Sequence, residues 1–195
     1  MKLSGLIAVI MLVLVVVAGS SCSCGTDGGT PTPTPGATGT PSGEYLEYTD
    51  EAGDFAISYP QAWVIPPQDE WPEGMFAVFE AGSACGNFTS TCVVHTQPMP
   101  QEVDFPTWFQ NALNLFAAQP GYTYLSQEST TVDGMDAFEH VHTSETGDGV
   151  LVQSMQVYAN AGSTVWIVSC GCDAGCWEQY EALFDTVAYS FHLLD

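Results

Sequence analysis

Alternation of hydrophobic and polar positions predicts a strand and a tight turn near the start of the folded part. In residues 55–59 an aromatic or aliphatic side chain stands at every second position, so these side chains share one face of a strand. Pro60 ends the strand because it has no N–H to donate to a ladder. Trp63 then opens a short second strand, so residues 53–65 are predicted to form a hairpin closed by a buried aromatic ring.

Two stretches have the periodicity of helices. Asp104 is the predicted N-cap of a helix that ends at Pro120-Gly121, and hydrophobic residues recur in it every three or four positions. Asp173 begins the second stretch, which continues to about Val187. The hydrophobic faces of both helices are expected to pack into the core.

Short strands and short turns are predicted for most of the remaining chain. The Asp133-Gly134 dipeptide is a strong hairpin signal. Successive strands with short turns favour an antiparallel sheet, and two helices flanking such a sheet make an α+β fold. The predicted strands span residues 76–80, 92–97, 122–131, 137–143, 150–158 and 164–169.

The first 21 residues have the pattern of an export signal peptide. Lys2 precedes an unbroken apolar run from Leu6 to Ala18, which is too short for a comfortable membrane span. Small residues and then Cys22 follow. The segment resembles a bacterial lipoprotein leader, which is cut before a cysteine that receives a lipid such as palmitate. Simple secretion after cleavage behind Ser20 and an uncleaved anchor are the alternatives.

Residues 22–43 form a linker rich in Thr, Pro and Gly. Alternating Thr and Pro in residues 30–35 favour extended polyproline II, and the segment has almost nothing to bury. A stalk behind a lipid-bearing Cys22 would hold the domain, predicted at residues 44–195, away from the membrane. The expected location is therefore extracytoplasmic, with the chain lipid-anchored to the cell membrane.

The charge of the chain limits its partners. It contains 23 Asp and Glu residues against a single Lys, with a net charge of −22. That lysine is Lys2, so the chain without its leader has no basic side chain other than four histidines. It therefore cannot neutralise nucleic-acid phosphates or hold an anionic membrane surface with basic residues. The carboxylates are expected to keep the surface soluble, and the alternative is that some collect divalent cations.

One motif resembles a known family, the PsbP-like superfamily. Its opening motif is similar to Gly53-Asp54-Phe55-x-Ile57-x-Tyr59-Pro60-x-x-Trp63, and the order of the later helices and turns agrees over about residues 48–192. The superfamily includes a photosystem II extrinsic protein, bacterial lipoproteins of the DcrB and LpqN type, and a eukaryotic Ran-binding import factor. The resemblance implies an α-β-α sandwich around an antiparallel sheet, no shared catalytic motif, and binding of proteins and sometimes of metal ions.

Seven cysteines in an exported chain favour disulfides. With Cys22 assigned to lipid and Cys24 in the linker, the disulfide candidates are Cys85, Cys92, Cys170, Cys172 and Cys176. The first two flank a short turn and could pair across it. One pair within the cluster of the other three, involving Cys176, would leave one thiol over. A zinc site that uses this cluster and a nearby histidine, and redox chemistry, are the alternatives.

His140 and His142 are the strongest candidates for a metal site. They stand two residues apart on a predicted strand and share a face, and Glu145 and Asp148 in the next turn could add oxygen ligands for Ca, Mn or Zn. The favoured interpretation is instead two exposed histidines on the polar side of the strand, with no cofactor. Phe138 lies on the same face, which weakens the metal hypothesis further.

Together these patterns predict a non-enzymatic binding or accessory module whose partner is a protein or small ligand and not a nucleic acid. The chain has no nucleophile elbow and no Gly-rich phosphate loop, and it lacks the Lys and Arg that stabilise phosphoryl or carboxylate chemistry. A divalent-metal-binding surface lipoprotein is the first alternative, and an envelope hydrolase is the second. A pocket with a histidine of perturbed pKa beside a serine or carboxylate would favour the hydrolase.

Overall fold

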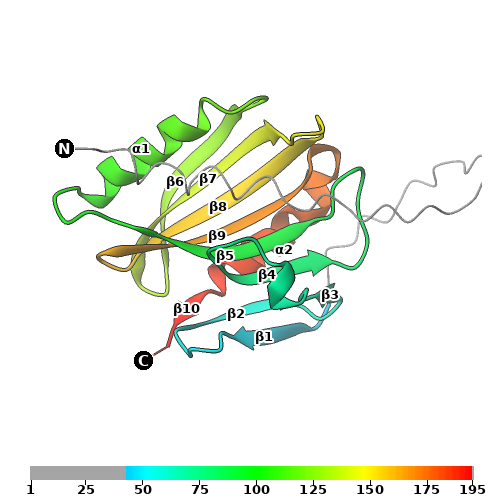
Figure 1. Ribbon diagram of the computed structural model, residues 1–195, viewed down its shortest axis with the longest axis horizontal. Coiled ribbons are helices and arrows are strands. Elements are labelled where there is room, and N and C mark those ends of the chain that lie inside the picture. Colours follow the sequence, from blue (N-terminus) through cyan, green and yellow to red (C-terminus); the bar gives the residue numbers. More distant parts are fainter. Residues whose placement is uncertain (1–42, 195) are drawn as a thin grey trace, which may run out of the picture.

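Two antiparallel sheets form the framework of residues 43–194, the part of the chain that the computed structural model describes (Figure 1). The predicted signal peptide, Cys22 and nearly all of the predicted linker lie outside the described residues. The small sheet has the order β1–β2–β10, with strands β1 (Tyr45–Thr49), β2 (Phe55–Pro60) and β10 (His192–Leu193). The large sheet has the order β3–β4–β5–β9–β8–β7–β6, with strands β3 (Trp63–Val64), β4 (Met75–Ala81), β5 (Thr91–Pro98), β6 (Thr123–Val132), β7 (Met135–Glu145), β8 (Leu151–Asn160) and β9 (Thr164–Asp173).

Two helices flank the sheets, α1 (Phe105–Phe116) and α2 (Trp177–Tyr189). Asp104 caps α1 as predicted, because its Oδ1 accepts a hydrogen bond from the Thr107 N–H at 2.8 Å. Asp173 does not begin the second helix. It is the last residue of β9, and its carboxylate accepts a hydrogen bond from the Gly175 N–H at 3.0 Å, so a 3₁₀ turn, η3 (Ala174–Cys176), precedes α2. The predicted α+β class with antiparallel sheets and two helices is confirmed.

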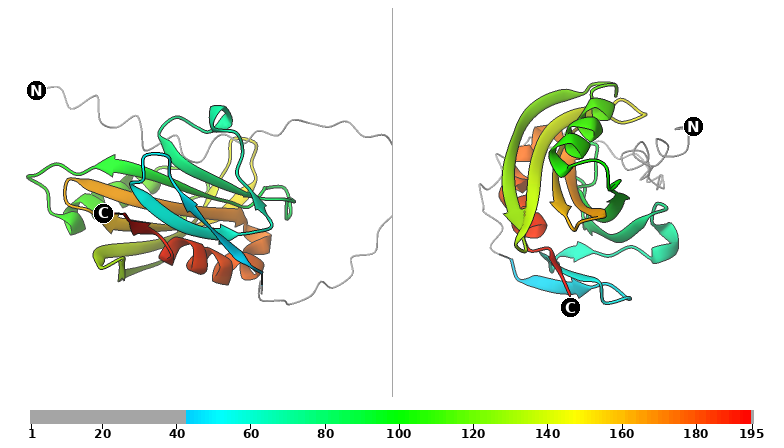
Figure 2. Two further views of the ribbon diagram at one scale, coloured as in Figure 1. Left: turned by 90° about the horizontal axis from the view of Figure 1, so that it is seen from below. Right: turned by 90° about the vertical axis from the view of Figure 1, so that its left-hand side faces the viewer.

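The two faces of the large sheet carry separate hydrophobic clusters. On one face α1 packs over β8 and β9 through Phe105, Phe109, Leu113, Tyr158, Val165 and Ile167. On the other face α2 and β2 pack together, and this larger cluster includes Phe55, Ile57, Val157, Val168, Phe184 and Val187. Neighbouring residues of one strand thus serve opposite faces, as the pleat requires. Figures 1 and 2 show α1 (green) on one side of the curved sheet and α2 (red) on the other, with the small sheet beside α2.

The hairpin predicted for residues 53–65 is wrong in its pairing. β2 lies between β1 and β10, so both of its edges are already occupied. β3 instead joins the large sheet through β4, where Trp63 stands opposite Ala81. Trp63 is buried as predicted. The Asp133-Gly134 turn between β6 and β7 is confirmed, and its two residues have the positive φ angles of 50° and 74° that a tight hairpin turn needs.

Two disulfides join segments that are far apart in the sequence, Cys85–Cys176 and Cys92–Cys170. The pairing considered from the sequence, Cys85 with Cys92 and a second pair within the 170–176 cluster, is therefore wrong. The physical reason is that β5 and β9 are neighbours and place Cys92 directly opposite Cys170. One thiol of the cluster is left over, as expected, and it is the buried Cys172.

Neither helix of residues 43–194 is long and apolar enough to cross a membrane.

Candidate functional site

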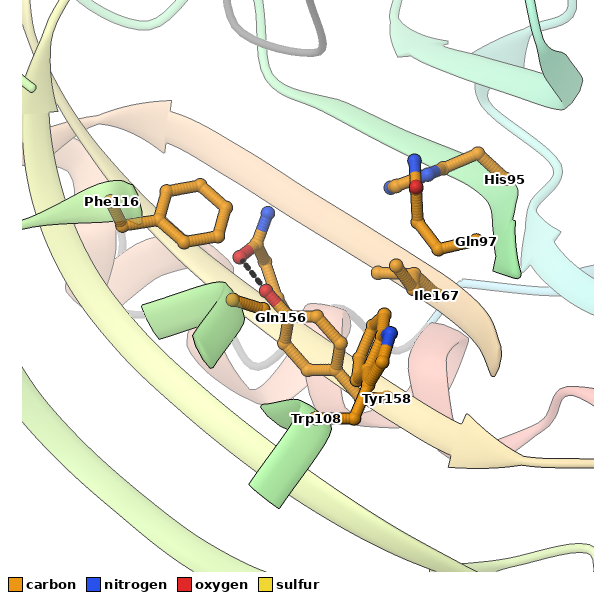
Figure 3. Close-up of a pocket in the computed structure, with 8 residues that line it drawn as sticks. His95, Gln97, Trp108, Phe116, Gln156, Tyr158 and Ile167 are labelled. Carbon is orange, nitrogen blue, oxygen red and sulfur yellow. Dashed lines mark hydrogen bonds between the residues drawn. The ribbon is translucent and has the colours of Figure 1, made fainter. Parts of the chain in front are cut away.

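A small cavity lies between α1 and the large sheet (Figure 3). Its volume is about 20 Å³, which is enough for one water molecule. Its walls come from β5, α1, β8 and β9, and the residues that line it are His95, Gln97, Trp108, Ala112, Phe116, Gln156, Tyr158 and Ile167. The interior of the domain is thus nearly filled at this point. Several of the groups that line the cavity are polar.

The polar groups beside this cavity form a chain of contacts across three strands. The Tyr158 hydroxyl donates to Gln156 Oε1 at 2.6 Å, and Gln156 Nε2 donates to Ser169 Oγ at 3.2 Å. Ser169 Oγ in turn lies 3.4 Å from His95 Nε2. Burial raises the pKa of Tyr158 above its ordinary value and lowers the pKa of His95 to about 4. All four side chains are therefore uncharged at neutral pH.

The contact between His95 and Ser169 is the arrangement that would favour a hydrolase. The structure brings these two residues together, and the sequence analysis did not single out either of them. Two features argue against catalysis here. The serine is only 8% exposed, and the adjoining cavity has room for one water molecule but not for a substrate. The geometry instead suits a buried polar network that stabilises the fold.

The two histidines of the predicted metal site lie under the end of α1 and are fully buried. The expectation that they are exposed is wrong, because Phe116 and Tyr122 cover them, with the Phe116 ring centroid 5.2 Å from that of His142. The two imidazoles stack at 4.7 Å with an angle of 10° between their planes. The signal for burial was present in the sequence, since Phe138 shares their face of β7 and belongs to the α1 cluster.

Burial also sets the chemistry of this histidine pair. The pKa of His140 falls to about 4 through desolvation, and that of His142 falls to about 3 through desolvation and then the neighbouring imidazole. The Tyr122 hydroxyl lies 3.1 Å from His140 Nε2. In residues 43–194 the other nitrogen of His140 and both nitrogens of His142 have no hydrogen-bond partner. The pair thus offers three unused polar atoms in an apolar setting.

The acidic residues of the predicted metal site lie apart from the histidines. Glu145 is exposed at the end of β7, and Asp148 is exposed in the following turn, where its carboxylate accepts a hydrogen bond from the Thr146 hydroxyl. Across residues 43–194 no three His, Cys, Asp or Glu side chains are grouped so that they could hold a metal ion. The structure therefore brings together His140 and His142 but does not join them to a third candidate ligand.

A larger hollow lies on the surface between the β1–β2 turn and the loop that contains the 3₁₀ turn η2 (Gln68–Glu70). Its volume is about 410 Å³, within the range of small-molecule sites. Both segments project on the same side of the molecule in Figure 2, the turn in cyan and the loop in teal. The side chains that line it include three aromatic rings and three carboxylates: Tyr48, Asp50, Glu51, Trp71, Glu73 and Phe76.

Each aromatic ring of the hollow has a contact that orients it. For Tyr48 and Phe76 this contact is with the body of the domain, and for Trp71 it lies within its own loop. Tyr48 packs edge-on against Phe79 at 5.5 Å between ring centroids, and Phe76 packs against Trp166 at 5.4 Å. Trp71 donates its indole N–H to the Pro66 carbonyl at 2.8 Å. The walls of the hollow are thus pre-arranged, which reduces the entropy lost when a ligand binds.

The β1–β2 turn is fixed by a carboxylate. Asp50 is only 8% exposed and accepts hydrogen bonds from the backbone N–H groups of Ala52, Asp54 and Phe55. The turn therefore presents Glu51 to the hollow in a defined position. The sequence shows a tryptophan among acidic residues in the η2 loop, but it does not show that this loop faces the β1–β2 turn, because the two segments meet only in the folded chain.

Comparisons with known proteins agree with this architecture. No curated protein matches the sequence significantly. The solved structure of cyanobacterial PsbP (CyanoP) from Synechocystis sp. PCC 6803 has a TM-score of 0.57 at 17% identity, and the match covers 84% of this chain and 99% of CyanoP. LpqN, described as involved in cell envelope biogenesis of Mycobacterium tuberculosis, has a TM-score of 0.57 at 13% identity over 78% of this chain and 91% of LpqN.

A eukaryotic protein shares the fold as well. The Ran-binding protein Mog1p of Saccharomyces cerevisiae has a TM-score of 0.57 at 14% identity, with 79% of this chain and 97% of Mog1p covered. At such identities these likenesses show a common fold. The profile of the family described as PsbP-like protein matches residues 4–193, which is nearly the whole chain. This chain therefore belongs to the PsbP-like protein family.

Proposed function

We propose that this chain is a non-enzymatic binding domain with the PsbP-like α-β-α sandwich, tethered outside the cytoplasm by a lipid on Cys22. The observation that carries the binding role is the contrast between the two hollows. The buried cavity has room for one water molecule, whereas the open hollow of about 410 Å³ has fixed aromatic walls and free carboxylates. The domain thus offers a prepared surface for a partner, and a protein partner fits best with a stalked domain of high negative charge.

The disulfides support the extracytoplasmic location, because such bonds persist in oxidising compartments.

The proposed lipid tether is tested with a Cys22→Ser variant expressed in a bacterial host. We expect the wild-type chain in the membrane fraction and digested by proteinase K added to intact cells, and the variant released into the soluble extracellular or periplasmic fraction. Equal membrane retention of both proteins would contradict the lipid anchor.

The binding role can be tested by a crosslinking experiment that suits this composition. A carbodiimide joins carboxylates to amines, and the sequence after the leader contains no lysine. Any lysine found joined to a carboxylate of residues 44–195 must therefore belong to another protein. We expect such adducts when intact cells that carry the chain are treated, identified after Glu-C digestion. Treated cells without lysine-linked adducts would contradict a protein-binding role.

Metal binding is the second candidate function, and the unpartnered nitrogens of His140 and His142 favour it. If the pair holds an ion, zinc, manganese or calcium should raise the melting temperature by several degrees after treatment with EDTA, because binding stabilises the folded state. A His142→Gln variant should lose that shift. Identical melting curves with EDTA and with each ion would exclude this function.

A further inference from the structure

The surface hollow combines two kinds of groups that act on the same type of ligand. Its aromatic rings, Tyr48, Trp71 and Phe76, line a space large enough for a small organic group. Rings of this kind attract cations that approach their faces, and the attraction grows as the cation loses water. Contacts with Phe79 and Trp166 hold two of these rings on the domain, and the hydrogen bond to the Pro66 carbonyl orients the third within its loop.

The carboxylates around the hollow have no positive partner in the domain. Asp50 is used by the backbone of the β1–β2 turn, which leaves Glu51 and Glu73 as exposed carboxylates on two sides of the space. Residues 43–194 contain no Lys or Arg to pair with them. The pKa of Tyr48 is raised by burial and then by the negative charges of Asp50 and Glu51, which places the field of these carboxylates at the aromatic wall.

The type of cation follows from these walls. A hard metal ion prefers six or more oxygen ligands, and most of the wall is aromatic or apolar. An anion would meet only negative charge. An alkylated ammonium or a planar guanidinium instead spreads its charge over a surface that can stack on aromatic rings while carboxylates neutralise it.

We propose that the hollow formed by Tyr48, Trp71, Phe76, Glu51 and Glu73 is a binding site for an organic cation, a quaternary ammonium or a guanidinium group. This inference rests on the proposed binding function and names the chemistry of its ligand. The same chemistry occurs in a free small molecule and in an arginine side chain of a protein partner, so the experiment has an arm for each source.

The test is calorimetric titration of the exported chain, purified as its host produces it. The quaternary ammonium arm compares choline with its neutral isostere 3,3-dimethyl-1-butanol. The guanidinium arm compares N-acetyl-arginine methylamide with the neutral citrulline derivative. We expect at least one cation to bind and its neutral counterpart to bind about tenfold more weakly, because the counterpart keeps the shape of the cation but lacks its charge. Selective binding of choline assigns the hollow to a small quaternary ammonium ligand. Selective binding of the blocked arginine, which carries the flanking amides of a polypeptide, assigns it to an arginine of a partner.

Variants then locate the site. Trp71→Leu removes a ring but keeps an apolar side chain, and Glu73→Gln removes a charge but keeps the size. Each should weaken cation binding about fivefold. The matched control is Glu102→Gln, an exposed glutamate that does not line the hollow, which should leave the affinity unchanged. All variants should melt within a degree or two of the wild type, since these side chains are not fully buried.

Three results would overturn the inference: equal binding of the cations and their neutral counterparts, no binding of either cation, or equal weakening in Glu102→Gln and Glu73→Gln. The carbodiimide experiment keeps the two proposals apart. Lysine-linked adducts in cells together with no cation binding in the calorimeter would leave the binding function standing and remove only the assignment of the hollow.

Discussion

Three of the four histidines of this chain are buried and uncharged at pH 7. His95, His140 and His142 are each at most 6% exposed, and desolvation is the main cause of the lowered pKa of each. They lie on the face of the large sheet that α1 covers, next to neutral Gln156 and Tyr158. Polar side chains have therefore been buried here without burying charge, which avoids the largest cost of an interior polar layer.

Acid should destabilise the domain through these histidines, and His95 allows the clearest measurement. Its pKa is about 4 in the folded chain and about 6.5 when exposed. Between these values the unfolded state binds a proton that the folded state does not, so the free energy of unfolding falls as the pH falls, by about 3 kcal/mol for this residue. Urea unfolding of the wild type and of His95→Gln near pH 7, 5.5 and 4.5 measures the effect.

The other titrating groups are the same in the wild type and in His95→Gln, so their contributions cancel when the two pH profiles are compared. Glu80 and Glu139 have raised pKa values because of burial, and they change stability with pH in the opposite direction in both proteins. The difference between the two profiles therefore isolates His95. We expect a smaller acid loss in the variant, and parallel profiles would show that this histidine does not titrate as a buried group.

At the scale of elements, α1 covers the buried histidines and their polar neighbours on one face of the large sheet. Phe109 stacks on Phe138 at 4.5 Å with an angle of 8° and meets Tyr158 edge-on at 5.0 Å. Phe116 lies over the histidine pair. Aromatic contacts thus hold the helix on a face that also carries hydrogen-bonding groups, and each contact excludes water from them.

Truncation of Phe109 should test how firmly α1 is held. The side chain is 1% exposed, so Phe109→Ala removes a buried ring and is expected to lower the free energy of unfolding by about 3–5 kcal/mol. The adjacent Gln110→Ala, at an exposed position of the same helix, should change it by less than about 0.5 kcal/mol. Denaturant unfolding measures both, and equal effects would contradict the packing of α1 described here.

The elements differ in how far the sequence predicts them. α1 was predictable because its evidence is local: the cap, the apolar period and the terminating Pro120-Gly121 fall within one short segment. The second partner of β2 and the partner of Cys92 were not, since both are set by strands that come much later in the chain. β10 follows β2 by more than a hundred positions, and the two cysteines of that bond are 78 positions apart. The hollow was missed for the same reason, because Tyr48 and Trp71 belong to separate segments. The burial of His140 could have been inferred from Phe138 on its face.

At the scale of the whole molecule, the domain combines a large negative charge with covalent crosslinks. The charge opposes compaction through self-repulsion. The two disulfides oppose expansion, since each removes conformations from the unfolded chain over 91 and 78 residues of separation. The fold is thus stabilised mainly by its hydrophobic clusters and disulfides, in the absence of Lys or Arg in residues 43–194 that could form ion pairs.

Reduction should therefore weaken the domain strongly, and thiol labelling should reveal one distinctive cysteine. Loop entropy gives the Cys85–Cys176 bond about 4–5 kcal/mol, and the Cys92–Cys170 bond, which then closes only the short ring between the two bonds, adds about 3 kcal/mol. A reducing agent is therefore expected to lower the melting temperature by about 15–30 °C. Cys172 is buried and its pKa is raised to about 12, so iodoacetamide should label it only after denaturation.

Mass spectrometry of the unreduced protein should give peptides that join Cys85 to Cys176 and Cys92 to Cys170. A Cys85–Cys92 peptide would contradict the structure.

The two bonds are nested, one inside the other, and this limits how far the domain can be extended if it is tethered as proposed. Pulling on residues 43 and 194 can extend only residues 43–84 and 177–194. The Cys85–Cys176 bond transmits the force directly between the two cysteines, so the polypeptide between them is not stretched. The elements of these two segments, β1, β2, β3, β4, α2 and β10, would yield to tension, while the polypeptide from β5 to β9 would bear no load. All residues that line the surface hollow belong to the first of these segments, so sufficient tension between residues 43 and 194 would unfold the hollow and release a ligand bound there.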